Sequence, residues 1–332
     1  MKGNNSTLSE KLDIIKVYTI LLVVLGHVLR MYTAEGAFPH QGTWVTEQMC
    51  SMIYSFHMPL FIFISGCIYG ICKRKGKYAS WKNLLSNKVK RIIYPYLSFG
   101  LLVLAPCMVY TNLSDNYITY CIKDLFGGGN IRHLWYLLSL FQMYVIAHFL
   151  RNVLNRQNWV IVFITIMLFV LIYRYATHFN ALQLRMTISY IPYFILGYYV
   201  GDDSFRMNMS NLRASILLLT SVIVWGLKYR LPAISVLATE YIVAFLLILA
   251  ILHFSGKVHS MGNVGKLILK NGMGIYLWHV VILYLAYYYD LFASAGLYLQ
   301  ICLMTIISLV LSVILTYFTR RMHLLFLLGE SK

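Results

Sequence analysis

Charged residues are scarce in this sequence, and proline and glycine are not abundant. Asp, Glu, Lys and Arg make up 12% of the 332 residues, and the mean hydropathy is +0.69. Soluble domains carry about 25% charged residues, so the composition excludes an ordinary soluble domain and indicates an integral membrane protein. The 6 prolines, the 21 glycines and the lack of low-complexity runs exclude a fibrous or disordered chain.

Signatures of processing and of metal binding are also missing. No secretory cleavage signature follows the first apolar run, which therefore predicts a retained helix rather than a removed signal peptide. The sequence has no CxxC pair, no Cys/His zinc spacing and no HExxH pattern, so we expect no metal. The six cysteines fall mostly within apolar runs and are predicted to be small buried hydrophobic residues.

Long apolar runs fill most of the chain, and each is near the length that spans a bilayer. They predict an all-α polytopic membrane protein with about ten transmembrane helices, forming one domain over residues 1–332 with a short N-terminal arm at 1–11 and no appended soluble domain. The runs lie near residues 12–30, 50–72, 92–111, 133–150, 158–176, 188–201, 213–228, 234–254, 271–289 and 295–318.

The positive charges lie in a pattern that predicts the topology. With a cytoplasmic N-terminus, the inner segments hold 21 of the 28 Lys and Arg, and the segment 73–91 alone holds eight. This is the positive-inside distribution of a multi-pass protein of the cytoplasmic (cell) membrane, with both termini cytoplasmic. The formal net charge of +17 therefore reflects topology and contact with membrane lipids, and does not indicate nucleic acid.

The first predicted span carries a lysine and a histidine on one stripe. Ten uncharged residues separate Lys16 from His27, and eleven steps of about 100° bring both side chains to the same helical face, roughly 16 Å apart along the axis. Ionisable groups at bilayer depth are costly and are functional candidates. Asp13 lies three residues before Lys16, at a spacing that orients the lysine.

Other polar residues within the spans are further candidates. His57 directly precedes a predicted kink at Pro59, and His279 lies inside the ninth run. Glu240, at the start of the eighth run, is either a functional carboxylate or an interfacial one. The adjacent Ser65 and Gly66 are small enough to let another helix approach closely.

Five stretches occur in an order that resembles the acyltransferase-3 family of membrane acyltransferases, particularly the branch similar to fucose 4-O-acetylases. They are "LDIIKVYTILLVVLGHV", "FHMPLFIFISGCIYG", "KVKRIIYPYL", "HLWYLLSLF" and "GMGIYLWH". The family's basic residue, ten-residue gap and histidine fall on Lys16 and His27, its preceding acidic position on Asp13, and its basic pair on Lys88 and Arg91. Lysine stands where arginine is commoner in both motifs, and it is a point charge rather than a bidentate fork.

The resemblance implies O-acetylation of a cell-surface or exported polysaccharide, or of its lipid-linked precursor, with cytoplasmic acetyl-CoA as donor. His27 is then the general base, or a carrier that passes the acetyl group outward in two steps. Lys16, Lys88 and Arg91 are expected to bind the CoA phosphates, and Asp13 to orient Lys16. His57, His279, Trp135 and Glu240 are expected to line the substrate path.

Two other functions remain open at the level of sequence. One is a transporter or flippase for a glycan or lipid, in which His27 and Glu240 couple to protons. Repeated halves with broken helices would favour that reading, and we find none in the sequence. The other is a membrane sensor or scaffold with a degenerate site, against which the intact Lys16–His27 stripe argues.

Overall fold

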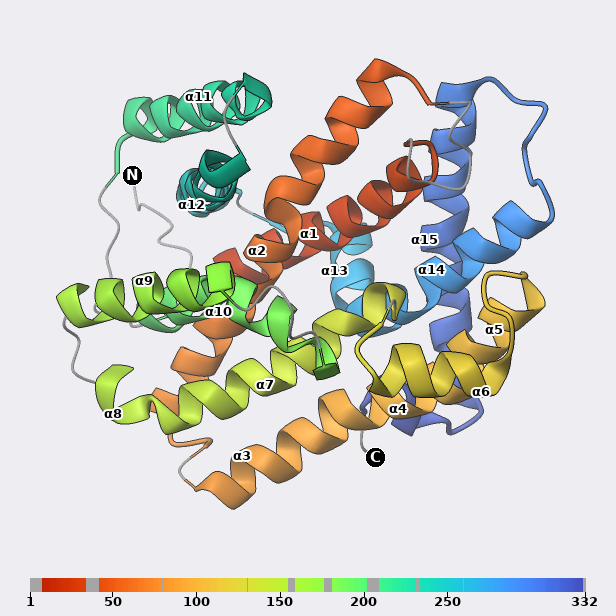
Figure 1. Ribbon diagram of the computed structural model, residues 1–332, viewed down its shortest axis with the longest axis horizontal. Coiled ribbons are helices and arrows are strands. Elements are labelled where there is room, and N and C mark those ends of the chain that lie inside the picture. Colours follow the sequence, from red (N-terminus) through yellow and green to blue (C-terminus); the bar gives the residue numbers. More distant parts are fainter. Residues whose placement is uncertain are drawn as a thin grey trace.

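The computed structural model describes residues 8–33, 42–78, 80–129, 131–154, 159–175, 181–201, 209–230, 233–258 and 260–330, and this part of the chain contains helices and no strand (Figure 1). Residues 1–7 of the predicted N-terminal arm lie outside it, and helix already begins at Leu8. In chain order the helices are α1 (Leu8–Met31), α2 (Trp44–Arg74), α3 (Trp81–Lys88), α4 (Tyr94–Phe99), α5 (Ala105–Tyr110), α6 (Tyr117–Thr119), α7 (Trp135–Phe149), α8 (Arg151–Leu154), α9 (Trp159–Tyr175), α10 (Leu184–Val200), α11 (Asn211–Leu227), α12 (Ala233–Ser255), α13 (Asn263–Lys270), α14 (Gly272–Tyr288) and α15 (Leu297–Arg321).

Each of the ten predicted runs coincides with a helical segment, but fewer are long enough to count as spans. In the described residues, five helices are long and apolar enough to cross a membrane, and a sixth counts if α13 and α14, bent by 79° at their junction, form one span. The protein is therefore a multi-pass, all-helical membrane protein. The number ten and the cytoplasmic location of both termini stay predictions. The five spans are Leu8–Met31, Trp44–Arg74, Trp81–Tyr110, Ala238–Ser255 and Leu297–Arg321.

The backbones of α2 and α10 are in direct contact, because each helix has a glycine where it meets the other. A Cβ atom on Gly66 of α2 would lie 2.1 Å from the carbonyl oxygen of Phe194, and one on Gly197 of α10 would lie 2.1 Å from that of Phe63. No side chain larger than hydrogen fits at either position. The prediction that Gly66 permits close helix packing is confirmed, and the neighbouring Ser65 hydroxyl bonds to Tyr136 of α7 at 3.2 Å.

The third span, Trp81–Tyr110, is interrupted by two π-helical turns, at Val89–Ile93 and Gly100–Leu104. A proline follows each turn, at Pro95 and Pro106, where the missing N–H breaks the ordinary hydrogen-bond ladder. Such turns are frequent at functional sites. The first of them begins directly after Lys88, which is the last residue of α3.

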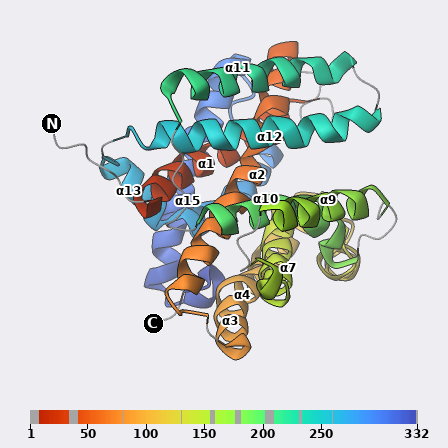
Figure 2. The ribbon, with the colours of Figure 1, turned by 90° about the vertical axis from the view of Figure 1, so that its left-hand side faces the viewer.

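Helices α11 and α12 lie alongside each other at one side of the molecule (Figure 2). The 3-10 turn Lys228–Arg230 ends α11, and the described part of α12 resumes at Ala233. This hairpin brings Lys228 close to Glu240 at the beginning of the apolar part of α12.

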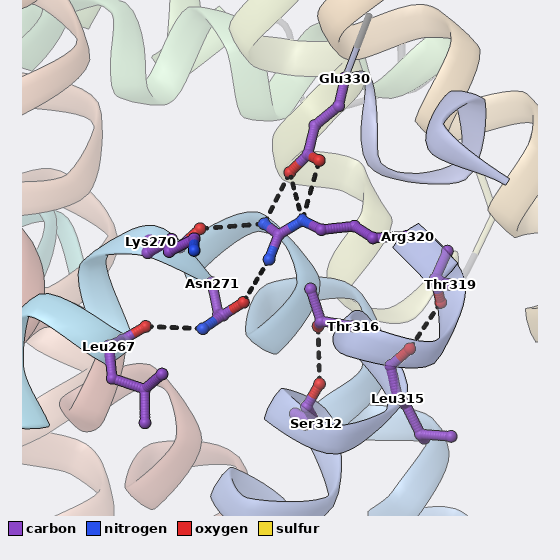
Figure 3. A network of polar contacts seen from close by, with 9 residues as sticks. All are labelled: Leu267, Lys270, Asn271, Ser312, Leu315, Thr316, Thr319, Arg320 and Glu330. Carbon is purple, nitrogen blue, oxygen red and sulfur yellow. Dashed lines mark hydrogen bonds and ion pairs between the residues drawn. The ribbon is translucent and has the colours of Figure 1, made fainter. Parts of the chain in front are cut away.

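A network centred on Arg320 ties the end of α15 to the break between α13 and α14 (Figure 3). The Arg320 guanidinium donates to both carboxylate oxygens of Glu330 at 2.7–3.2 Å, to Asn271 Oδ1 at 2.5 Å and to the Lys270 carbonyl at 3.0 Å. Asn271 Nδ2 in turn donates to the Leu267 carbonyl at 2.8 Å. The network thereby fixes the bend from which α14 starts.

Candidate active site

Four histidines from separate segments meet at the crossing of α1, α2, α14 and the turn before α7. They are His27 of α1, His57 of α2, His133 of the 3-10 turn Arg132–Leu134, and His279 of α14. The ring of His279 lies 5.1 Å from that of His27 and 5.4 Å from that of His133, centroid to centroid. The ring of Tyr54 lies 4.8 Å from that of His57, and its hydroxyl is 3.4 Å from His27 Nδ1.

Backbone carbonyls one helical turn earlier fix the orientation of two of these rings. His57 Nδ1 donates to the Ile53 carbonyl at 2.7 Å, and His279 Nδ1 donates to the Ile275 carbonyl at 2.8 Å. A neutral imidazole has one N–H, so in both residues Nε2 carries the lone pair. At Nε2, each of these two rings can therefore accept a hydrogen bond but cannot donate one.

The histidines surround a small cavity of about 200 Å³. Of the predicted path residues, His57 and Trp135 line it together with His27, whereas His279 packs behind His27 without lining it. The remaining wall is mostly aromatic and apolar. The lining residues are Val23, His27, Tyr54, His57, Met58, His133, Trp135, Met186, Tyr190 and Tyr276.

A larger cavity of about 570 Å³ adjoins the small one, since Tyr54, Met186 and Tyr190 line both. Glu240, a predicted path residue, lines this larger cavity and not the small one. Its wall carries cations and carboxylates as well as tyrosine rings, among them Arg30, Glu47, Tyr173, Lys228, Glu240 and Tyr241. Burial lowers the pKa of the Lys228 ammonium, and the charge of Glu240 opposes that shift.

Lys16 and Asp13 lie on α1 toward its other end, away from the lining of both described cavities. Both are partly buried, and their charges are close enough to interact. The continuous helix Leu8–Met31 confirms that Lys16 and His27 share one helix. The structure thus separates the lysine from the histidine along a single rigid element.

Lys88 is buried among tyrosines, whereas Arg91 is exposed. The Lys88 ammonium lies 3.6 Å from the ring centroid of Tyr144 and 5.0 Å from that of Tyr78, so aromatic faces surround much of the cation. The described residues place no carboxylate in an ion pair with Lys88. A buried cation normally has an anionic partner, so Lys88 is suited to an anion from outside the chain.

Comparison with known proteins identifies the family. The family model described as an acyltransferase domain, that of the acyltransferase-3 family, matches residues 9–317. The chain belongs to the acyltransferase-3 family. The match includes all nine predicted site residues and covers the four histidines that meet in the structure. No curated protein and no solved structure matches the chain.

Family membership establishes a membrane acyltransferase in general terms, and it confirms the resemblance seen in the five stretches. The branch similar to fucose 4-O-acetylases stays a prediction. Among the described residues, no group of three or more His, Cys, Asp or Glu side chains is arranged to hold a metal ion.

Several residues of the candidate site in this acyltransferase-3 protein were not among those predicted from the sequence. His133 begins the stretch "HLWYLLSLF", but only Trp135 was selected from it. Tyr54 and Tyr190 line both cavities, yet 27 tyrosines in the sequence gave no reason to single them out. The one sequence feature that could have indicated His133 is its position as an imidazole at the edge of a predicted span.

Proposed function

We propose that this protein transfers an acetyl group from cytoplasmic acetyl-CoA to a hydroxyl of a cell-surface or exported polysaccharide, or of its lipid-linked precursor. The observation that carries the proposal is the position of His27, which lines a small cavity beside a larger polar one. Acyl transfer needs a base next to a chamber for the acyl group and a second chamber for the acceptor. The arrangement around His27 supplies both.

His27 is the proposed general base. A sugar hydroxyl has a pKa far too high to attack a thioester unaided at neutral pH, and an imidazole is the side chain best matched to removing its proton. Tyr54 Oη lies 3.4 Å from His27 Nδ1. In the proposed tautomer, Nδ1–H donates to this hydroxyl, and Nε2 keeps the lone pair that the base requires. In a two-step variant, the same nitrogen carries the acetyl group transiently.

The donor is proposed to bind at the opposite end of α1, through Lys16, Lys88 and Arg91. The phosphates of CoA need cations facing the cytoplasm, and the basic segment 73–91 meets this need under the positive-inside assignment. The buried ammonium of Lys88 has no carboxylate partner among the described residues, which supports an anionic ligand there. Asp13 is proposed to orient Lys16 along the path by which the pantetheine arm reaches His27.

The acceptor is proposed to occupy the larger cavity. Carboxylates and cations there offer hydrogen-bond acceptors and donors to sugar hydroxyls, and tyrosine rings offer faces for stacking. Under the predicted topology, this cavity lies toward the extracytoplasmic ends of α1 and α2. Glu240 is therefore proposed to bind the acceptor rather than to take part in the chemistry at His27.

The proposal is tested with washed membranes that hold the wild-type protein, and with matched membranes that lack it. Both receive acetyl-CoA labelled on the acetyl group, and label is followed into the glycan fraction. We expect label only where the protein is present, released by mild alkali as an ester. Equal label in both membranes, or label that alkali does not release, would contradict O-acetylation.

A further inference from the structure

His133 is a buried imidazole whose polar atoms are left unsatisfied. Its side chain is 2% exposed, and neither ring nitrogen has a hydrogen-bond partner among the described residues. The Leu277 backbone approaches the ring, but at a geometry too poor to count as a hydrogen bond. A buried donor or acceptor without a partner is costly, so an unsatisfied imidazole at the wall of a cavity points to a partner that arrives with the substrate.

Two ring contacts hold His133 in place at the wall of the small cavity. Its ring lies 5.2 Å from that of Tyr276, whose hydroxyl donates to the His133 carbonyl. The His133 ring also lies 5.4 Å from that of His279, centroid to centroid. Of the side chains that line the two described cavities, His133 alone has buried nitrogen or oxygen atoms with no partner in the described part of the chain.

The four histidines also differ in what they can offer to a ligand. The N–H groups of His57 and His279 are already donated to backbone carbonyls, and that of His27 is assigned to Tyr54 under the proposed function. His133 is left as the imidazole whose N–H has no hydrogen-bond partner among the described residues, in a side chain that lines the small cavity. A donor held rigidly in a dry site is what stabilises a developing oxyanion.

We propose that His133 donates a hydrogen bond to the acyl carbonyl oxygen and stabilises the tetrahedral oxyanion, an assignment that rests on the proposed function. The acceptor oxygen bonds to the acyl carbon while its proton passes to His27 Nε2, and the carbonyl π pair moves onto the oxygen held by His133. Collapse of this intermediate breaks the C–S bond and releases the CoA thiolate. The imidazolium of His27 then returns the proton to that thiolate, giving free CoA and the ester.

The test compares His133→Ala, His133→Asn and His133→Gln in membranes given labelled acetyl-CoA, at equal amounts of folded protein. Both transfer to glycan and release of free labelled acetate are followed, because the oxyanion forms on the donor carbonyl whichever hydroxyl attacks. His148→Gln is the matched control. Like His133, His148 is buried, and it lies in α7, the helix that follows the His133 turn. Its ring packs on Trp81, outside both described cavities.

Loss of an oxyanion donor lowers kcat about 10²–10³-fold, which is the effect expected for His133→Ala. At least one of the two amide variants, which keep an N–H donor, should recover tenfold or more over His133→Ala and retain the acid limb of the wild-type pH–rate profile. Wild-type rates for His133→Ala, or amide variants as inactive as His133→Ala, would overturn the role of His133 alone. Wild-type protein inactive in both readouts would overturn the proposed function and this role with it.

Discussion

The histidine centre and the Arg320 network are both polar clusters in a largely apolar protein, but their hydrogen bonding is opposite. The Arg320 guanidinium donates to a carboxylate, a side-chain amide and a backbone carbonyl. The amide belongs to Asn271, which in turn donates to the Leu267 carbonyl. Around His27, both ring nitrogens of His133 and Nε2 of His279 have no partner among the described residues. The first cluster is complete without a ligand.

The difference indicates what each cluster is for. A satisfied polar network stabilises and positions the elements it joins. An unsatisfied one persists where the missing partners come from a substrate. The two clusters are linked by α14, which begins directly after Asn271, the residue bonded to Arg320, and which carries His279 to the histidine centre. The Arg320 network therefore supports a site to which it contributes no reacting group.

The largest effect is expected from His27→Ala. If His27 is the general base, as proposed, its removal should lower acetyl transfer by about 10²–10⁴-fold. The partly buried imidazole makes one long side-chain hydrogen bond, of 3.4 Å, and lines a cavity, so its loss should leave the thermal unfolding midpoint close to that of the wild type. Transfer rates and unfolding curves of the two proteins in the same detergent check both parts. His253→Ala, a change on α12 outside both cavities, is the control and should keep wild-type transfer.

Arg320→Ala should show the opposite pattern. It leaves Glu330 and Asn271 without their donor, and hydrogen bonds to charged groups contribute about 1.5–3 kcal/mol each when well formed. Because the Arg320 and Glu330 side chains are 24% and 35% exposed, we expect a loss of stability near the lower end, about 2 kcal/mol. A lowered unfolding midpoint, with less than a tenfold change in transfer per folded molecule, is the predicted result.

Lys88→Met tests the proposed binding site for the CoA phosphates. Losing a cation that binds a CoA phosphate should raise the KM for acetyl-CoA on the order of tenfold, equivalent to about 1.4 kcal/mol, with little change in kcat. Lys90→Met, two residues away and exposed, is the matched control. An unchanged KM in Lys88→Met would remove Lys88 from the donor site.

Glu330→Gln should give the smallest effect. The amide oxygen still accepts from Arg320, so only the charge assistance is lost, which we expect to cost about 1 kcal/mol or less. The measurement is again the unfolding midpoint, compared with Arg320→Ala and with the double variant. Additive losses in the double variant would contradict a direct Arg320–Glu330 interaction.

Hydropathy was sufficient to predict the helical segments, because every apolar run coincides with a helix. It did not predict that the third span carries two π-helical turns or that a 79° bend separates α13 from α14. Those features depend on tertiary contacts. The bend is held by Arg320 and Glu330, which are 49 and 59 residues from Asn271 along the chain, a separation that no local pattern reports.

The candidate site was only partly predictable, for a related reason. His27, His57 and His279 stood out as ionisable groups inside apolar runs, and the structure brings all three together. His133 lies in a short turn before α7, where a histidine is unremarkable in sequence. That it faces the cavity without a partner follows from the packing of Tyr276 and His279 around it, which only the fold reveals.

The most direct measurement places His27→Ala and Arg320→Ala side by side, with acetyl transfer and the unfolding midpoint determined on the same preparations. We expect His27→Ala to lose transfer by at least about 10²-fold at an unchanged midpoint, and Arg320→Ala to lose stability with transfer per folded molecule largely kept. Full transfer by His27→Ala, or loss of transfer without loss of stability in Arg320→Ala, would contradict this expectation.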